Sequence, residues 1–569
     1  MKRRSFALSI ALLAMALSSY TQSARPAPTS GRISGTVVHA LTGQPLGGID
    51  VSISPTEQRD LVTETTTGPD GRFVFENVAR GKFSLIAQGS GFSEQAYQQH
   101  APYSTAIAVG PGLPSENLIF QLVPDGSISG SVQDEENEMV RNGDVLLFAR
   151  EGATGKVELR TSVNLGDQGR YHFGHLSPGT YYVAVVAQPW YAADPPGAEN
   201  STKLSMEGET PAEQNSEVSS SPSADAPLDV AYRTTFYADA VDAESATPIQ
   251  LHAGERIGAD VTLRAVPAVR LTIRNASTDP NQPASAGVQQ RIFGRELVPV
   301  LGRVQPGASG TITVGGIPSG HIVVNLRTYS GKEWKNYVRE LDVSTGTEMD
   351  ASENFASEVL IRGTVRNLQP GPFPPGTYIR FFDRDSHQGF GATVSEKGTF
   401  EVSQIFSSAI PYEVAVIHPR HAMVEKINAK GAEVVGRTVT FPRTGTVDLA
   451  VTLSLGAGRI DGMVMREGKG ISQTMVLLVP QSLQGNIDLF RRDQSDSDGT
   501  FSLYQVLPGR YTLVAIENGW NLDWQNLDVL RPYLEHGEPV VITGSNTYKV
   551  SVTAQGTNAT PVAGARAQN

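Results

Sequence analysis

The sequence contains no cysteine. This absence excludes disulfide bonds, thiolate metal sites, a cysteine nucleophile and the acylated cysteine that anchors bacterial lipoproteins. Beyond residue 17 the chain also has no apolar run long enough to cross a membrane as a helix. Because disulfides are excluded, packed apolar cores must hold the folded protein together.

The chain is also short of positive charge, with 46 Lys and Arg against 58 Asp and Glu, for a net charge of −12. This balance disfavours nonspecific binding to nucleic acid, so we expect a glycan or a protein of the cell envelope as partner. Neither a Gly-x-x-x-x-Gly-Lys-Ser/Thr phosphate loop nor a Gly-x-Ser-x-Gly nucleophile elbow is present. The sequence therefore predicts no cofactor and no enzyme of these classes.

The N-terminus has the pattern of an export signal. Basic residues at Lys2 to Arg4 precede an apolar run from Phe6 to Leu17, which small and polar residues follow. This run is too short for an ordinary transmembrane helix. We predict a signal peptide over residues 1–24 and a mature protein in the periplasm, on the cell surface or outside the cell. No transmembrane segment is expected after removal of the signal.

One block recurs five times along the rest of the chain. Its pattern is a glycine, one residue, an aromatic residue or Ile, one residue and an apolar residue, followed by a turn and an alternating strand. The five copies begin near Pro69, Asp167, Ala308, Glu396 and Ser497. Alternation with a period of two places the apolar side chains on one face of a sheet.

A second element precedes most copies of this block. It occurs at Gly31–Val37, Gly126–Val132, Val359–Val365 and Gly458–Val464, and each of these segments has a glycine inside an alternating strand. The corresponding segment of the third copy, Val269–Ile273, lacks that glycine. A glycine within a strand indicates a bulge or a close approach of another backbone segment.

Together these elements predict an all-β fold, a tandem array of about five antiparallel β-sandwiches. We name the five ranges units one to five: 31–124, 125–265, 266–356, 357–455 and 456–554. Polar, proline-containing stretches predict a disordered insert at about 192–228 in unit two and a disordered tail at 555–569. The short linkers between units favour a semi-rigid string of beads.

The repeats resemble the carboxypeptidase regulatory-like domain, and this resemblance implies transthyretin-like (Ig-like) β-sandwiches. In unit one, Ile33–Val37, Thr42–Leu46, Thr67–Phe73 and Gly81–Leu85 follow one another in the order found in that family. Units two and five also match, and internal repetition extends the resemblance to the degenerate units three and four. Similar tandem arrays are typical of exported proteins of soil bacteria such as Acidobacteria. In metallocarboxypeptidases this domain follows the catalytic domain and does not itself cleave peptides, so the resemblance implies a non-catalytic scaffold or binding protein.

A carboxypeptidase-type metallohydrolase is a remote alternative. Such an enzyme needs His-x-x-Glu and a distant histidine, so that three ligands leave one zinc position open for water. His252–Glu255 supplies the first part literally, but it lies between a turn and a closing strand and has no evident third ligand. We therefore predict no metal site and no catalytic residue.

Aromatic residues in two equivalent loops are the candidate binding residues. Trp190 and Tyr191 follow the hairpin of unit two, and Trp520 and Trp524 lie at the same position in unit five. They could stack on sugar rings, which makes a carbohydrate-binding protein the alternative function, or they could cap the open end of the sandwich core. The sequence leaves both interpretations open and does not define the oligomeric state.

Overall fold

The computed structural model describes residues 30–557 apart from several segments. These are residues 101, 142, 153–154, 167, 190–191, 193–228, 277–283, 294–295, 308–309, 331–332, 352–358, 368–370, 384–388, 405–409, 418–422, 443–444, 455–456 and 482–488. The predicted signal peptide, the predicted insert apart from Ala192, and the tail beyond residue 557 lie outside the described residues.

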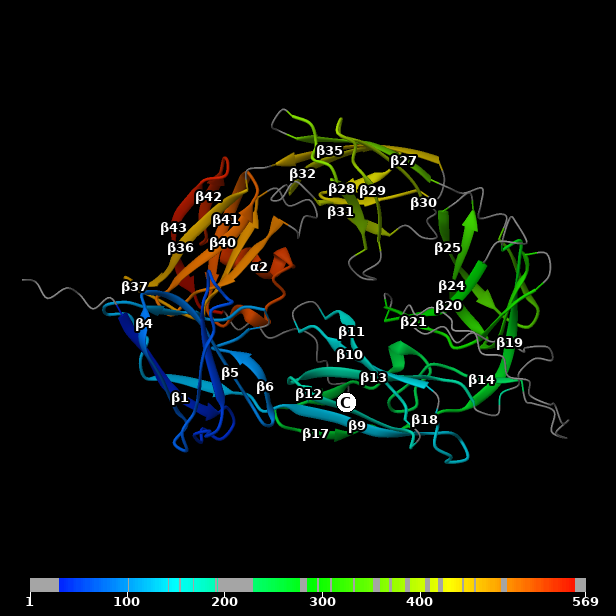
Figure 1. Cartoon of the computed structure of the whole chain (residues 1–569), viewed down its shortest axis with the longest axis horizontal. Helices are drawn as coiled ribbons and strands as arrows, with labels where there is room; N and C mark the ends of the chain where they lie inside the picture. Colours follow the sequence, from blue (N-terminus) through cyan, green and yellow to red (C-terminus); the bar gives the residue numbers. More distant parts are fainter. Residues whose placement is uncertain are drawn as a thin grey trace, which may run out of the picture.

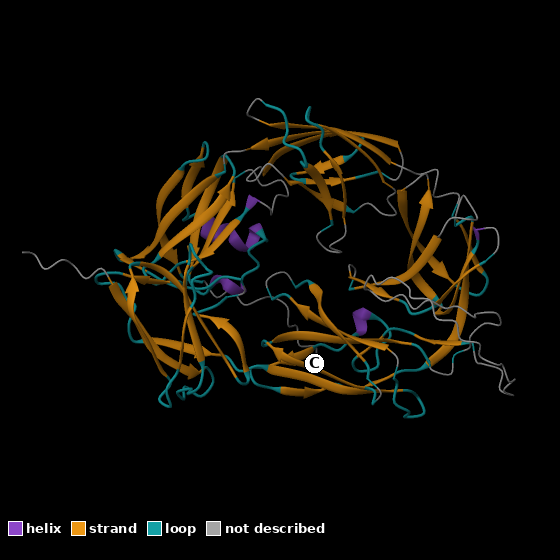
Figure 2. Ribbon diagram, viewed as in Figure 1, coloured by secondary structure: helices purple, strands orange, loops and turns teal. Residues whose placement is uncertain are grey.

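Strands dominate the described chain, as Figure 2 shows, and the prediction of an all-β tandem array is confirmed. Short 3-10 turns occur at η1 (Ala243–Ser245) and η4 (Gly519–Asn521), and unit five contains the helix α2 (Leu527–Leu534). The repeat pattern of the sequence did not predict this helix. Asn526 caps it by accepting a hydrogen bond from the N–H of Asp528 (3.0 Å), and Leu530 and Tyr533 bury its apolar side.

Unit one shows the sandwich plan. Its first strand, β1, pairs antiparallel with β4 and parallel with β8, and a second sheet lies across the core. The first sheet has the order β4 (Arg72–Ala79), β1 (Ser30–His39), β8 (Leu118–Leu122). The second sheet has the order β3 (Thr63–Thr66), β2 (Asp50–Pro55), β5 (Gly81–Gly89), β6 (Phe92–Ala96), with β7 (Ile107–Val109) also on β5.

Units two and three repeat the two-sheet plan. The sheets of unit two are β12 (Arg170–Leu176), β9 (Gly126–Gln133), β17 (Arg256–Gly258) and β18 (Val261–Thr262), and β11 (Val157–Asn164), β10 (Gly143–Arg150), β13 (Gly179–Ala187), β15 (Thr235–Phe236) and β16 (Ile249–Leu251). Those of unit three are β14 (Val230–Tyr232), β19 (Ala265–Arg274), β23 (Ile312–Pro318), β22 (Arg303–Pro306) and β26 (Thr347–Asp350), and β21 (Glu296–Pro299), β20 (Ala284–Ile292), β24 (Gly320–Ser330) and β25 (Glu333–Val343).

Units four and five complete the array, and in unit five the strands join into one continuous sheet. The sheets of unit four are β30 (Thr399–Gln404), β27 (Val359–Asn367), β35 (Gly445–Ser454) and β32 (Met423–Lys430), and β29 (Gly389–Thr393), β28 (Tyr378–Phe382), β31 (Pro411–Ile417), β34 (Thr438–Thr440) and β33 (Glu433–Val435). Unit five has β37 (Lys469–Gly470), β36 (Gly458–Arg466), β43 (Thr547–Gln555), β41 (Gly509–Ile516), β38 (Met475–Pro480) and β39 (Arg491–Gln494), with β40 (Thr500–Val506) on β36 and β42 (Glu538–Ile542) on β41.

Each of the five predicted ranges contains its own cluster of buried apolar side chains. In unit one, Ile33 and Val37 of β1 pack with Phe73 of β4 and Leu85 of β5, between the two sheets. The unit boundaries stay predictions drawn from the sequence. One strand crosses them, because β14, which lies within the range of unit two, pairs with β19 of unit three.

The glycine inside the opening strand faces the aromatic residue of the repeated block. The cross-strand pairs are Gly35–Phe73, Gly130–Tyr171, Gly363–Phe400 and Gly462–Phe501. A Cβ atom on Gly363 would lie 2.1 Å from Cζ of Phe400, so the ring occupies the space that a side chain would fill. In unit three both members change, and Ile273 pairs with Ile312. Besides the predicted close approach of backbone, which Gly35 makes to the carbonyl of Leu118, the glycine therefore makes room for an aromatic ring.

The turn that opens the repeated block keeps its glycine in every unit. In unit one the N–H of Gly68 donates to the carbonyl of Arg72 (3.1 Å), and the glycine that ends the turn has a positive φ. The five glycines Gly71, Gly169, Gly310, Gly398 and Gly499 have φ between 61° and 83°. Other residues rarely adopt this conformation, which explains why the block keeps its glycine.

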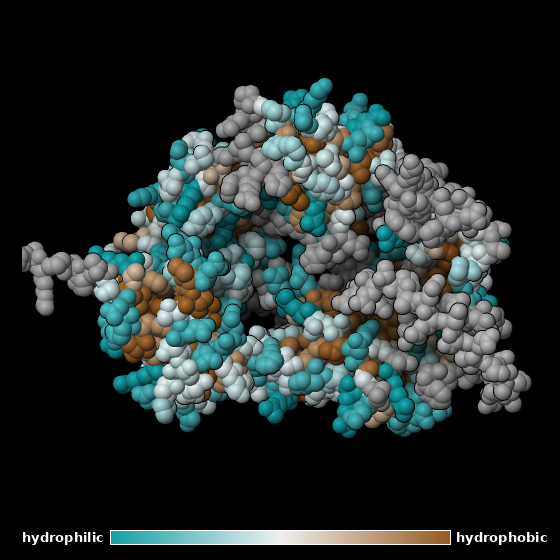
Figure 3. All heavy atoms as spheres, in the orientation of Figure 1, coloured by the Kyte–Doolittle hydropathy of each residue, from teal (hydrophilic) through white to brown (hydrophobic). Residues whose placement is uncertain are grey.

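The five units follow one another around a closed path (Figure 1). Figure 3 shows the surface hollowed near the centre of this path. Between units two and three, Phe148 and Tyr182 share an apolar cluster with Ile292 and Val298. At the other end of the path unit five lies against unit one, so the array of units closes on itself. The polar side chains described below make this contact.

The glycine–aromatic contact gives a first prediction. In unit four the three atoms nearest to the ideal Cβ position of Gly363 all belong to the ring of Phe400. Gly363→Ala should therefore lower the free energy of unfolding of unit four by about 1–3 kcal/mol through overpacking. In the double variant with Phe400→Leu the combined cost should be smaller than the sum of the two single costs.

Hydrogen exchange of peptides from β27 and β30 measures this double-mutant cycle within the full chain. Gly258→Ala is the matched control, because Gly258 also lies in a strand but has no atom within 4 Å of its ideal Cβ position. Additive costs for the Gly363 and Phe400 changes would contradict the explanation.

Candidate interface between the first and last units

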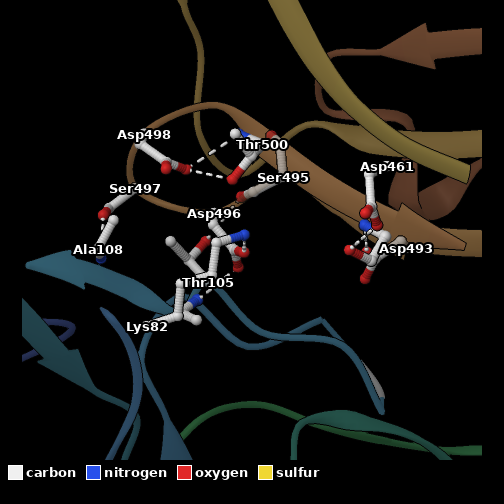
Figure 4. A network of polar contacts seen from close by, with 12 residues as sticks. Lys82, Thr105, Ala108, Asp461, Asp493, Ser495, Asp496, Ser497, Asp498 and Thr500 are labelled. Carbon is white, nitrogen blue, oxygen red and sulfur yellow. Dashed lines mark hydrogen bonds and ion pairs between the residues drawn. The ribbon is translucent and has the colours of Figure 1, made fainter. Parts of the chain in front are cut away.

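Units one and five meet through a network of polar side chains (Figure 4). Unit one contributes Lys82 on β5, the loop before β7, and β7 itself. Unit five contributes the end of β39, the turn that follows it, and the loop around η4. The residues that meet lie about four hundred positions apart in the sequence, as in the pair of Lys82 and Asp496.

The turn of unit five that makes this contact is its copy of the repeated turn. The N–H of Asp496 donates to the carbonyl of Thr500 (2.8 Å), and the N–H of Gly499 donates to the carbonyl of Asp496 (2.8 Å). Where unit one has Gly68 and Pro69, unit five has Asp496 and Ser497. The shared backbone thus presents two hydrogen-bonding side chains that unit one lacks at these positions.

These side chains dock on the open edge of β7. In the described sheets β7 pairs only with β5, so its other edge would otherwise expose unpaired backbone groups. The N–H of Ala106 donates to Oδ1 of Asp496 (3.0 Å), and the N–H of Ala108 donates to Oγ of Ser497 (2.8 Å). In return, the N–H of Ser497 donates to the carbonyl of Ala106 (2.9 Å). The turn therefore acts as a short substitute strand.

Gln494 is the central buried polar group of the interface, with 1% of its surface exposed. Its Nε2 donates to the carbonyl of Gln98 (2.7 Å) and to Oγ1 of Thr105 (2.8 Å), while its Oε1 lies 2.9 Å from Nδ1 of His100. Since the amide nitrogen already donates twice, His100 must carry its proton on Nδ1 to donate to the amide oxygen. One side chain of unit five thereby binds three groups of unit one.

Charge complements these hydrogen bonds. Lys82 forms an ion pair with Oδ2 of Asp496, and the two side chains are 32% and 15% exposed. Burial raises the pKa of Asp496 above its ordinary value, while Lys82 and the N–H of Ala106 oppose the shift. Nearby, burial raises the pKa of Asp493 from 3.8 to about 6, although the N–H groups of Ser502 and Gln494 donate to its carboxylate.

The predicted aromatic residues of unit five lie at this interface. The ring of Trp520 stacks on that of His100, with centroids 4.8 Å apart and an interplanar angle of 7°. The guanidinium of Arg492 lies 3.9 Å from the ring centroid of Trp524 and 5.2 Å from that of Tyr103. Both tryptophans also pack against the buried cluster beneath α2. This placement agrees with the core-capping interpretation and adds a role in the contact with unit one.

The other predicted binding residues, Trp190 and Tyr191, lie outside the described residues. The residues that sequence reasoning missed are Lys82, His100, Gln494 and Asp496. The one signal in the sequence was the change from Gly-Pro to Asp-Ser within a turn that is otherwise repeated.

His252 and Glu255 form a local pair. Nδ1 of His252 lies 2.8 Å from Oε2 of Glu255, and both side chains are exposed. The backbone N–H and the imidazole of His252 lower the pKa of Glu255. Within the described ranges, no group of three or more His, Cys, Asp or Glu residues is arranged to hold a metal ion. The geometry of the pair is that of a surface turn.

Residues 32–122 match the family model of the carboxypeptidase regulatory-like domain. The match covers unit one, where the sequence motifs of that domain are most complete. A search of curated proteins finds no match. In the part of the chain that the structure describes, no helix is long and apolar enough to span a membrane.

Several solved structures resemble parts of the fold at low identity. The Bacillus anthracis TIE protein is 10% identical, with 92% of this chain and 73% of that chain covered and a TM-score of 0.15. A streptococcal ancillary pilin is 10% identical, with coverage of 51% and 99% and a TM-score of 0.18. The shaft pilin SpaA of Lactobacillus rhamnosus GG is 10% identical, with coverage of 42% and 98% and a TM-score of 0.19.

The raised pKa of Asp493 predicts a pH dependence of the stability of unit five. A folded-state pKa near 6, above the ordinary value of 3.8, means that the folded state binds the proton more tightly than the unfolded state. This contribution is fully present below about pH 4 and is lost as the pH rises through 6. It amounts to at most about 3 kcal/mol, and Asp493→Asn should remove it.

Urea unfolding at pH 4 and pH 7 measures this effect. In a background with Trp190→Phe and Trp334→Phe, the remaining Trp520 and Trp524 report on unit five by their fluorescence. An equal change in the unfolding midpoint with and without Asp493→Asn would show that another group causes the pH dependence.

Removing the central amide should open the closed array. Gln494→Ala removes the hydrogen bonds that its side chain makes with the carbonyl of Gln98 and with the side chains of Thr105 and His100. We expect the interface to weaken by about 1–3 kcal/mol. Small-angle scattering should then report a larger radius of gyration, and hydrogen exchange at β7 should accelerate.

Gln44→Ala is the control for this prediction, because the side chain of Gln44 is exposed in a turn of unit one. A radius of gyration that stays equal in both variants would mean that the contacts of Gln494 do not hold units one and five together.

Proposed function

We propose that this chain, whose first unit is a carboxypeptidase regulatory-like domain, is an exported, non-catalytic scaffold or binding protein of the cell envelope or extracellular space. The observation that carries the proposal is the closed array itself. The described chain contains five separate sandwich cores. Unit five contacts unit one through a largely polar interface. Because packed side chains fill the interior of each sandwich, a ligand can bind only to the loops and the outer surfaces.

The buried titratable groups support a structural role over a catalytic one. Asp496 accepts hydrogen bonds from unit one and pairs with Lys82, and Asp493 accepts two backbone N–H groups. The hydrogen bonds and the ion pair of these two carboxylates thus connect structural elements of the protein. The partner that best fits the net charge of −12 is neutral or basic, either an envelope protein or a glycan.

Carbohydrate binding is the second candidate, and the aromatic loops support it. In the closed array, however, one face of Trp520 is covered by His100 and the ring of Trp524 is covered by Arg492. A sugar ring could stack on the face of Trp520 that His100 covers only after unit five has left unit one. Arg492 belongs to unit five and lies over Trp524 whether or not the array is closed, so a glycan site on the covered face of Trp520 requires the open form.

A polysaccharide pull-down separates these two candidates. The full-length protein is compared with Trp190→Ala, Trp520→Ala and Trp524→Ala, each alone and in the Gln494→Ala background. Binding that appears on opening and disappears with Trp520→Ala would establish the glycan function at unit five. Binding that survives all three tryptophan changes would remove the aromatic loops from the proposal.

The absence of catalysis is tested directly. We expect the purified full-length protein, supplied with zinc, to release no C-terminal residues from peptides, because His252 and Glu255 satisfy each other on the surface. His252→Ala should leave the metal content and the solution behaviour unchanged. Zinc-dependent peptide cleavage that is lost in His252→Ala would overturn the proposal in favour of the metallohydrolase alternative.

A further inference from the structure

We propose that the interface between units one and five also joins separate copies of this chain, with unit five of one copy docked on unit one of another. This inference goes beyond the proposed function, since it would hold whatever ligand the scaffold binds. Its partner is a second copy of the same chain, recognised by the edge of β7 and by Lys82.

The contacts of the interface do not depend on the two units belonging to one chain. The hydrogen bonds of Ala106, Ala108 and Thr105, and the ion pair of Lys82, all run directly between unit one and unit five. None of these contacts passes through units two to four. Two chains could therefore make the same contacts in the same geometry.

The composition of the interface is that of a contact that opens and closes. Of the seven apolar clusters formed by described residues, only the cluster of Phe148 and Ile292 extends over two units, namely two and three. Units one and five instead meet mainly through amide, hydroxyl and charged groups, which water can solvate again after separation, and through the rings of His100, Tyr103 and Trp520. Polar contacts of this kind between domains resemble transient protein–protein interfaces.

The symmetry of the contact determines which assemblies are possible. Unit one presents a strand edge and unit five presents a turn, so the contact is heterologous. Heterologous contacts between copies produce closed rings, including an exchanged dimer, or open head-to-tail chains. Closure within one chain competes with them through the effective concentration that the intervening units provide. Assembly between copies should therefore grow with protein concentration.

A charge exchange tests the proposal with the full-length chain. Lys82→Asp places a carboxylate opposite Asp496, and Asp496→Lys places an ammonium opposite Lys82, so neither single variant can close on itself with the native charge pairing. In an equal mixture of the two variants, opposite charges meet in both contacts between unlike copies. We expect each variant alone to sediment as a monomer and the mixture to form dimers or longer assemblies.

Two further variants make this result specific. The double variant with Lys82→Asp and Asp496→Lys in one chain restores closure and should sediment as a compact monomer. Adding Gln494→Ala to both members of the mixture should reduce assembly at least tenfold, because the central hydrogen bonds are lost while the charges remain. Assembly that persists with Gln494→Ala would show nonspecific attraction and overturn the proposal.

A wild-type experiment keeps the test valid if a charge variant fails to fold. Isotope-labelled and unlabelled wild-type protein are mixed at high concentration, and native mass spectrometry counts mixed dimers. Mixed dimers that Gln494→Ala removes and Gln44→Ala leaves unchanged support the proposal. Only monomers at every concentration, or a mixture of charge variants that stays monomeric, overturn it. Because these readouts concern assembly, they are independent of glycan binding and peptidase activity.

Discussion

The contact between a bare glycine and an aromatic ring is the constraint on which four of the five sandwiches depend. The opening strand is central in its sheet, with the block strand on one side and the closing strand on the other, as β1 lies between β4 and β8. A Cβ atom at Gly35 would lie 2.4 Å from the carbonyl oxygen of Leu118 on β8 and 2.9 Å from the ring of Phe73. The ring and the closing strand can approach together only because the glycine has no side chain.

Unit three shows that this pair of positions requires a certain total side-chain volume rather than a glycine and an aromatic residue. The glycine is replaced by Ile273, and the aromatic position across from it holds Ile312. Two medium-sized side chains thus fill the space that a glycine and a large ring fill elsewhere, as expected for a close-packed interior. The weak sequence match of unit three therefore reflects a paired change within the same plan.

The sequence predicted the repeated elements well because their signals are local. A glycine at positive φ, such as Gly499, and an alternating strand are encoded within a few neighbouring residues. The closed array was not predictable in the same way, since it depends on residues such as Lys82 and Asp496 that meet only after four units have been placed in space. Trp520 was recognised as unusual, but a sequence pattern does not distinguish an exposed ring from one stacked on His100. Helix α2 was missed because eight residues are too few for a clear helical period.

The lack of cysteine means that no disulfide bond can join units one and five. Without disulfides, closure of the array rests on noncovalent contacts, and these are mostly polar. Burying Gln494 gains little net affinity, since its hydrogen bonds replace those with water, but any misaligned partner would leave the amide unsatisfied. The ion pair of Lys82 and Asp496 likewise adds more to orientation than to strength. The interface is therefore selective for one partner surface and readily reversible, and those two properties allow the same contact to form within a chain or between chains.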